Sequence, residues 1–279
     1  MIDTALARLR EPRLGMVFVS GVVALLMAAH WPPMAVPAIA LLGLAVVRPQ
    51  IAVRPVVLWA LAASWFAAIL LVPERMEDHV PLFTIWLVAL AVSLGPDNGT
   101  EFVSRAAWHA RMLIGVTFAA AVAWKLFFGT YVNGVTLWTF MLVDKRFQPL
   151  ATVVGLSDST IEQQRVALSA LLAGSRDSVP LESPTAVVWI ITATAVLTLL
   201  LEATIAMSHL LPDSSRLAVL RLPSIALFGV VTYGVVPVVP FAALLSLMAV
   251  AVARWRYGAM WVMPVLMVVS VARLMVLTV

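Results

Sequence analysis

Cysteine is absent from this 279-residue sequence, which excludes disulfides, thiolate catalysis and cysteine-ligated metals. Charged residues are also scarce: they make up 11 % of the chain, whereas soluble domains have about 25 %. The sequence contains no HExxH motif, P-loop or glycine-rich dinucleotide motif. It also contains no basic stretch interleaved with aromatic residues. We therefore expect neither a metal ion nor a nucleic acid among its ligands.

Apolar residues form 63 % of the sequence, and the mean hydropathy is +1.04. This composition predicts an all-α polytopic membrane protein, with 1–279 as a single transmembrane domain. The residue usage is typical of a bacterium, so we expect the inner (cytoplasmic) membrane. Because a span needs roughly 20 residues, we expect about nine transmembrane helices. The apolar segments lie near 14–31, 34–47, 56–72, 80–95, 107–128, 185–211, 219–236, 238–253 and 257–278.

Arginines lie in alternate connections between these segments. If every segment crosses the membrane, one side receives Arg8, Arg10, Arg13, Arg48, Arg54, Arg105, Arg111, Arg216, Arg221, Arg254 and Arg256. The other side receives the acidic loop 74–79 and the long stretch 129–184. Cytoplasmic loops carry an excess of Lys and Arg. The pattern therefore predicts that the N-terminus is inside the cell and the C-terminus outside.

The stretch 129–184 is the longest connection. Its first part mixes aromatic and aliphatic residues with Asp144, Lys145 and Arg146, which is typical of a helix in the membrane interface. In its second part, Ser157 or Ser159 would cap an amphipathic helix. We expect an interfacial helical segment at 131–172, in contact with membrane lipids. The outer face of 129–184 is also a candidate surface for a protein partner.

The fifth apolar segment has a cation at each end. Arg111 and Lys125 are 14 residues apart, or about 21 Å along a helix, so each would lie near one face of a bilayer core about 30 Å thick. Lys125 is followed by Leu-Phe-Phe and therefore lies inside the apolar run. Its side chain must reach the interface, find a partner or lose its proton. A desolvated, neutral lysine would be a usable base.

Three further polar residues fall at or near membrane depth. His79 begins the fourth segment on the side of Lys125, either as its partner or as a solvated loop residue. Glu202 lies deep in the sixth segment and should be protonated or paired. Counted from the outer end, it lies past mid-membrane, which favours pairing with inner-side arginines. Arg273, near the outer end of the last segment, would reach outward or hold an anionic group.

Four short motifs follow one another between about 56 and 253. They are Asp78-His79-Val-Pro-Leu; Arg111 with Lys125-Leu126 and Tyr131-Val-Asn-Gly134; Glu202 before Pro212-Asp-Ser-Ser-Arg216; and Tyr233-Gly-Val-Val-Pro-Val-Val-Pro240. In order and spacing they resemble the membrane part of vitamin K-dependent gamma-glutamyl carboxylase. The chain thus resembles the HTTM (horizontally transferred transmembrane) superfamily, to which that carboxylase and its bacterial relatives belong.

The resemblance implies a role for each motif. Lys125 would be the catalytic base that takes a proton from a bound hydroquinone, and His79 would stabilise the anion or relay the proton. The ligand would be a reduced, menaquinone-like quinone or a similar lipid-soluble molecule. Ligand binding would fall to Arg273, Trp124 and Tyr131, and structural intramembrane roles to Arg111 and Glu202.

Two departures from the family pattern narrow the expected function. The family's Phe-His pair is missing after the Arg216 loop, and no stretch matches the large luminal domain of the carboxylase. We therefore expect chemistry on a quinol or lipid and not carboxylation of protein glutamate. The alternative is a non-catalytic membrane subunit or assembly module that binds a partner protein or lipid. A transporter is a third option, which the proline-broken helices favour but which no inverted repeat supports.

Overall fold

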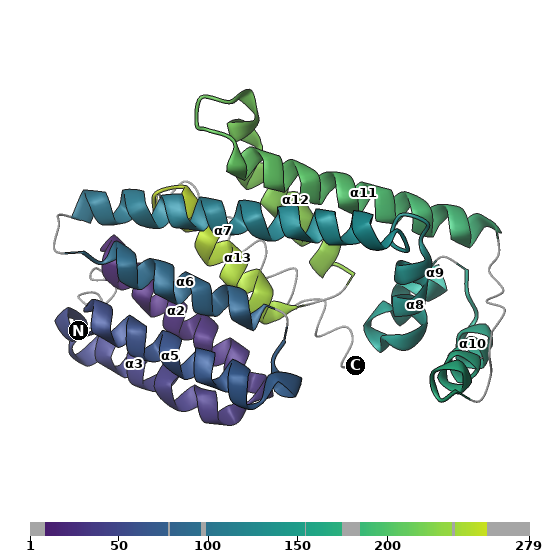
Figure 1. Ribbon diagram of the computed structural model, residues 1–279, viewed down its shortest axis with the longest axis horizontal. Coiled ribbons are helices and arrows are strands. Elements are labelled where there is room, and N and C mark those ends of the chain that lie inside the picture. Colours follow the sequence, from purple (N-terminus) through teal and green to yellow (C-terminus); the bar gives the residue numbers. More distant parts are fainter. Residues whose placement is uncertain are drawn as a thin grey trace.

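The computed structural model describes residues 9–77, 79–95, 99–153, 155–174, 185–235 and 238–255. Throughout these ranges the regular elements are helices (Figure 1), which confirms the predicted all-α class. Each of the first eight predicted apolar segments coincides with a helix. The predicted ninth segment, 257–278, lies outside the described residues. The predicted ligand-binding residue Arg273 belongs to this segment and is therefore outside the described residues as well.

The N-terminal part of the chain is a layer of neighbouring helices. In order they are α2 (Pro12–Met27), α3 (Ala35–Val47), α4 (Pro49–Ala52), α5 (Pro55–Leu71) and α6 (Val80–Ser93), with short 3-10 turns at η1 (Ala28–His30), η2 (Pro32–Met34) and η3 (Pro73–Arg75). Proline in the first turn suits the starts of α2, α5 and α6, because no helical partner exists for an N–H there. The Glu11 carboxylate caps α2 by accepting the Leu14 N–H at 2.8 Å.

The long helix α7 (Gly99–Phe128) lies across the top of this layer, and a second long helix, α11 (Thr185–Leu210), packs against α7 (Figure 1). α7 has 30 residues, about 45 Å of helix, and begins eight residues before the predicted segment. Its extra turns are polar. An i,i+4 ion pair between Glu101 and Arg105 supports them, and Arg105 also donates to the carbonyl of Ser93 at 3.1 Å.

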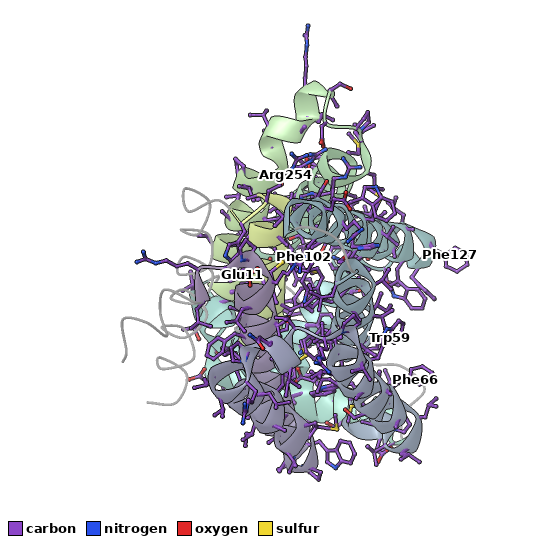
Figure 2. All side chains as sticks on the ribbon, turned by 90° about the vertical axis from the view of Figure 1, so that its left-hand side faces the viewer. Glu11, Trp59, Phe66, Phe102, Phe127 and Arg254 are labelled. Carbon is purple, nitrogen blue, oxygen red and sulfur yellow. The ribbon has the colours of Figure 1, made fainter. Side chains whose placement is uncertain are left out.

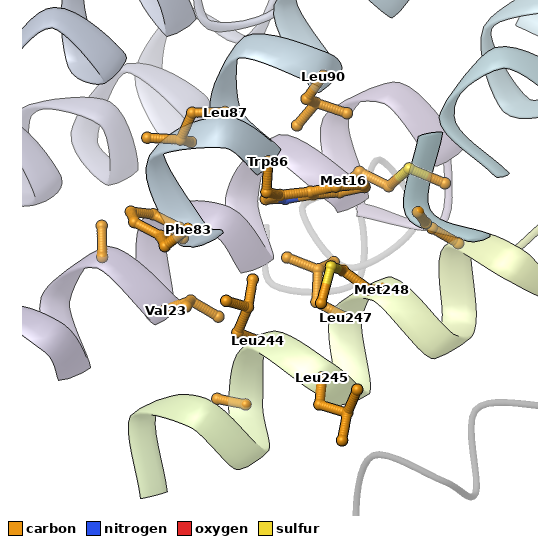
Figure 3. Close-up of a cluster of buried hydrophobic side chains, with 14 of the residues drawn as sticks. Met16, Val23, Phe83, Trp86, Leu87, Leu90, Leu244, Leu245, Leu247 and Met248 are labelled. Atoms are coloured by element: carbon orange, nitrogen blue, oxygen red, sulfur yellow. The ribbon is translucent and has the colours of Figure 1, made fainter. Parts of the chain in front are cut away.

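The C-terminal helices complete the core. They are η5 (Arg216–Leu220), α12 (Arg221–Tyr233) and α13 (Val239–Val252). α13 packs against α2 and α7, and the fully buried Trp86 of α6 lies between α2 and α13 (Figure 3). The Trp86 Nε1–H donates to the Ser20 hydroxyl of α2 at 3.1 Å. A buried indole N–H needs such a partner.

The residues between α7 and α11 form a smaller helical group, as predicted. It comprises α8 (Val135–Val143), η4 (Lys145–Phe147), α9 (Gln148–Val153) and α10 (Asp158–Leu172). These helices have their own small core, which Val187 and Ile191 of α11 complete. Ser157 caps α10 by accepting the Thr160 N–H, which confirms one of the two predicted caps. Gly134 begins α8 with φ +80°, a backbone conformation that glycine adopts without strain.

Three of the described helical stretches are long and apolar enough to cross a membrane: Glu101–Phe128, Val187–Leu210 and Arg216–Tyr233. Five other apolar helices are shorter, over Pro12–Met27, Pro32–Val47, Pro55–Leu71, Val80–Ser93 and Val239–Val252. Large apolar side chains such as Trp59, Phe66 and Phe127 point outward along one side of the molecule (Figure 2). These features are those of a membrane protein.

Candidate functional site at the α7–α11 interface

Lys125, in the last turn of α7, forms an ion pair with Glu202 of α11. The lysine side chain is 18 % exposed and the glutamate side chain 6 %. Removing charges from water is costly, so each of these groups depends on its partner. Of the three alternatives that the sequence leaves for Lys125, the structure therefore shows the second: the lysine has found a partner.

Our prediction that Glu202 pairs with inner-side arginines was wrong. That prediction measured depth from the outer end of α11, as if α7 and α11 ended level. α11 instead extends beyond the end of α7 toward α8 (Figure 1). Gly134 packs so closely on α11 that a Cβ there would lie 3.0 Å from Ile191 Cγ2. This offset brings Glu202 level with Lys125.

The turn after α7 adds an aromatic ring to the pair. The Lys125 Nζ lies 4.6 Å from the centroid of the Tyr131 ring, which is cation–π distance. Burial raises the pKa of the Tyr131 phenol. The neighbouring Thr198 hydroxyl lowers this pKa, and the Glu202 charge raises it again, with a net shift upward. The phenol therefore stays protonated at neutral pH and keeps its hydrogen for donation.

Trp124 precedes the lysine and lies on the outward surface of α7. Its side chain is 67 % exposed, and its ring centroid is 4.2 Å from that of Phe128. Exposed aromatic side chains at a helix end are typical of the membrane interface. The structure thus brings Lys125, Tyr131 and Glu202 into contact and places Trp124 beside them, toward the surrounding lipid.

Only one of the two oxygens of the Glu202 carboxylate has a hydrogen-bond partner among the described residues. Its Oε1 accepts from Lys125, whereas the buried Oε2 has no hydrogen-bond partner among the described residues. A buried acceptor without a donor is costly, and such groups are rare in native structures. A ligand hydroxyl could donate to Oε2 while its oxygen accepts from the Lys125 ammonium. A hydroquinone carries such a hydroxyl, so the donor and acceptor set fits a reduced quinone.

His79 has neighbours other than Lys125. It precedes α6, its Nε2 is 2.9 Å from a Glu77 carboxylate oxygen, and its ring centroid is 5.9 Å from that of Phe241. Among the described residues, no hydrogen bond, ion pair or ring contact joins His79 to Lys125. The predicted pairing of the two in one site is therefore not seen as a direct contact.

Arg111 is held at the opposite end of the α7–α11 pair. It donates to Asp213 Oδ1 at 2.8 Å, and Arg221 donates to the same oxygen at 2.5 Å. Asp213 thereby links α7, the end of α11 and the start of α12. The hydrogen bond from Arg221 holds the pKa of Asp213 below its usual value, with the charges of both arginines acting in the same direction. Arg111 is thus part of a structural cluster.

Sequence reasoning missed the role of Asp213. The available signal was its position as the one carboxylate in the 211–220 loop, on the side of the membrane where Arg111 and Arg221 were expected. Comparison of the chain with protein-family models, with curated proteins and with solved structures found no match.

Proposed function

We propose that this chain is a multi-pass protein of a bacterial inner membrane, with nine crossings and a carboxylase-like arrangement of motifs. Eight described helices follow the predicted segments, and the arginine-bearing connections alternate with those that hold Glu77 and the 129–174 helices. The segment 257–278 would supply the ninth crossing. The order and spacing of the four motifs support a distant relation to the HTTM superfamily.

The α7–α11 site would bind a lipid-soluble molecule with an acidic hydroxyl, such as a reduced menaquinone-like quinone. The unpaired, buried Oε2 of Glu202 beside Lys125 carries this proposal. The exposed aromatic surface at Trp124 and Phe127 lets an apolar ligand approach from the membrane. Tyr131 covers the lysine and can donate a further hydrogen bond to a bound oxygen atom.

In this proposal Glu202 and Lys125 have different roles in deprotonating the ligand. The Glu202 carboxylate would take the proton from the ligand hydroxyl, and the Lys125 ammonium would stabilise the oxygen anion that remains. This differs from the expectation of a neutral Lys125 acting alone, because Lys125 has a carboxylate partner, Glu202. A bound hydroquinone would supply the electrons for reaction with oxygen. Arg273 and His79 would act outside this pair, on the second substrate or the proton path.

Oxygen uptake by the full chain in nanodiscs with reduced menaquinone tests the proposal. We expect uptake by the wild type, and a loss of about 100-fold in both Lys125→Ala and Glu202→Gln, the scale of general base catalysis. The matched control is Arg216→Gln, an exposed residue in η5 at the far end of α11. The proposal fails if the wild type shows no uptake, or if both variants keep it while their thermal midpoints show folded protein.

A second candidate is an assembly module that binds a partner protein at the outer face. The 129–174 helices expose apolar side chains, with Val153 82 % and Val166 61 % exposed. These helices share a small hydrophobic core of their own. They therefore form a compact group that can present one surface to a partner. If this candidate is right, one defined protein should co-purify with the wild type and be lost in Val153→Asp and Val166→Asp. Oxygen uptake should then be absent from the wild type as well.

A further inference from the structure

The surface between α3 and α5 contains an apolar groove of about 380 Å³. Leu41 and Leu44 line it from α3, and Val57 and Leu61 from α5. It extends along α5 from Val56 to Ser64, about 12 Å at 1.5 Å per residue. The helices that flank it carry exposed large apolar side chains, among them Val36, Ile39, Val46 and Val56. This edge of the helical layer therefore faces an apolar environment.

A second hollow follows at the connection between the same two helices. It has a volume of about 580 Å³ and is lined by Val47, Arg48, Pro49, Gln50, Ile51 and Arg54. Leu44 of the groove is one helical turn before Arg48, and Val56 is two residues after Arg54. The apolar groove and the arginine-lined hollow are thus adjacent on one helical hairpin, formed by α3, the connection 48–54 and α5.

Within the described part of the chain, Arg48 and Arg54 have no carboxylate as a counter-charge. The sequence contains no Asp or Glu from residue 12 to residue 73, and among the described residues no carboxylate pairs with Arg48 or Arg54. Arg111 and Arg221, by contrast, share Asp213. Both arginine residues are exposed. An anion between them would neutralise their mutual repulsion, and guanidinium groups bind phosphate with two parallel hydrogen bonds.

We propose that this hairpin binds one anionic phospholipid, with the phosphate between Arg48 and Arg54 and an acyl chain in the α3–α5 groove. The positive charges of Arg48 and Arg54 favour a ligand with an anionic headgroup. The apolar groove next to these arginines favours a ligand with an acyl chain, which a lipid has and a free anion lacks. The arginine-rich connections are expected on the cytoplasmic side, where anionic lipids attract basic residues. This proposal is independent of the α7–α11 site and of any quinone chemistry.

Native mass spectrometry of the full chain in detergent, titrated with phosphatidylglycerol and with phosphatidylcholine, tests the proposal. We expect one retained phosphatidylglycerol and no comparable retention of phosphatidylcholine. Arg48→Gln/Arg54→Gln should weaken phosphatidylglycerol binding about 25-fold, since each basic residue near an anionic surface contributes about fivefold. The control Arg216→Gln/Arg254→Gln removes the same charge from two exposed residues elsewhere and should leave the retained lipid in place.

Two further measurements separate the headgroup from the chain. Ala60→Phe would fill the groove without changing a charge, because Ala60 lines it, and we expect it to weaken retention of long-chain phosphatidylglycerol. Millimolar inorganic phosphate should not displace the lipid. The proposal is overturned if the Arg216/Arg254 control loses as much lipid as the Arg48/Arg54 variant, if Ala60→Phe has no effect, or if phosphate alone competes. Equal thermal midpoints show that the variants are folded.

Discussion

Lys125 and Glu202 are 77 residues apart in the sequence, and their ion pair joins the last turn of α7 to the middle of α11. A pair this well buried has two consequences. Removing one partner leaves the other charge without compensation in an apolar setting, whereas removing both leaves no charge to be compensated. The same feature that makes the site a candidate for proton chemistry therefore makes it a measurable element of stability.

Lys125→Met should lower the free energy of unfolding by about 3 kcal/mol, because the Glu202 charge stays buried without its partner. The double variant Lys125→Met/Glu202→Leu should recover most of this loss. Chemical unfolding in mixed micelles measures both. The control Arg146→Met breaks an ion pair with Asp144 in which the arginine side chain is 49 % exposed, so its cost should stay below about 1 kcal/mol. Equal losses in the single and double variants would contradict the argument.

The eight apolar helices α2, α3, α5, α6, α7, α11, α12 and α13 could be predicted from hydropathy, because each apolar run is bounded by proline, arginine or a polar turn. The start of α7 could not be predicted in this way. Glu101 and Arg105 are charged and were therefore assigned to a loop, whereas the structure shows that they form an i,i+4 ion pair within the helix. Length also limits the prediction: α6 is an apolar helix of 14 residues, shorter than the span that hydropathy assigns to it. Burial by its neighbours is what makes this short helix stable.

The site was predicted in part. Lys125 and Tyr131 were singled out as an intramembrane cation and a motif aromatic, and the structure brings them together. The partner of Lys125 was missed, because pairing depends on how far α11 extends past α7. That offset is set by the packing of Val187 and Ile191 on α8. A single sequence contains the residues of such a contact but not the relative position of the two helices.

Asp213 should make stability depend on pH. Its hydrogen bond from Arg221 lowers its pKa in the folded protein, so its contribution is present above the ordinary carboxyl pKa of about 4. The contribution is lost as the pH falls from there through the lower folded-state value. The Asp213 side chain is 65 % exposed, so the effect should be less than about 1 kcal/mol and should shrink with salt.

Thermal unfolding of wild type and Asp213→Asn between pH 6 and pH 3 checks this prediction. We expect the two midpoints to differ at pH 6 and to converge at low pH. The control Glu101→Gln removes a carboxylate of similar exposure whose partner is on its own helix, and it should change the pH profile less. A constant gap between wild type and Asp213→Asn at all pH values would show that the Asp213 charge has no such role.

Ser20→Ala should destabilise the α2–α6 contact, because the buried Trp86 N–H loses its acceptor. Hydrogen bonds between membrane helices contribute about 0.6 kcal/mol on average and up to about 1.7 kcal/mol, and we expect the upper end here because Trp86 is fully buried. Unfolding in mixed micelles measures the change. In the control Ser64→Ala, the lost hydroxyl donates only to the Leu61 carbonyl of its own helix, and stability should stay within about 0.5 kcal/mol. Equal effects of the two substitutions would contradict the inferred role of Trp86.

Gly115 of α7 packs against the side chains at the C-terminal end of α11. A Cβ there would lie 2.8 Å from Leu210 Cδ2 and 3.3 Å from the His209 Cβ, so Gly115→Val should force the helices apart and cost about 1–3 kcal/mol. Gly43→Val is the matched control, because a Cβ at Gly43 meets nothing within 4 Å and valine has the better helix propensity. We expect the Gly43→Val control to be neutral or slightly stabilising.

Separating α7 from α11 should also loosen the neighbouring Arg111–Asp213 contact. A Gly115→Val protein should therefore lose part of the pH dependence of stability that Asp213 contributes. If both glycine variants unfold at the wild-type midpoint, then α7 and α11 do not depend on close approach at this point.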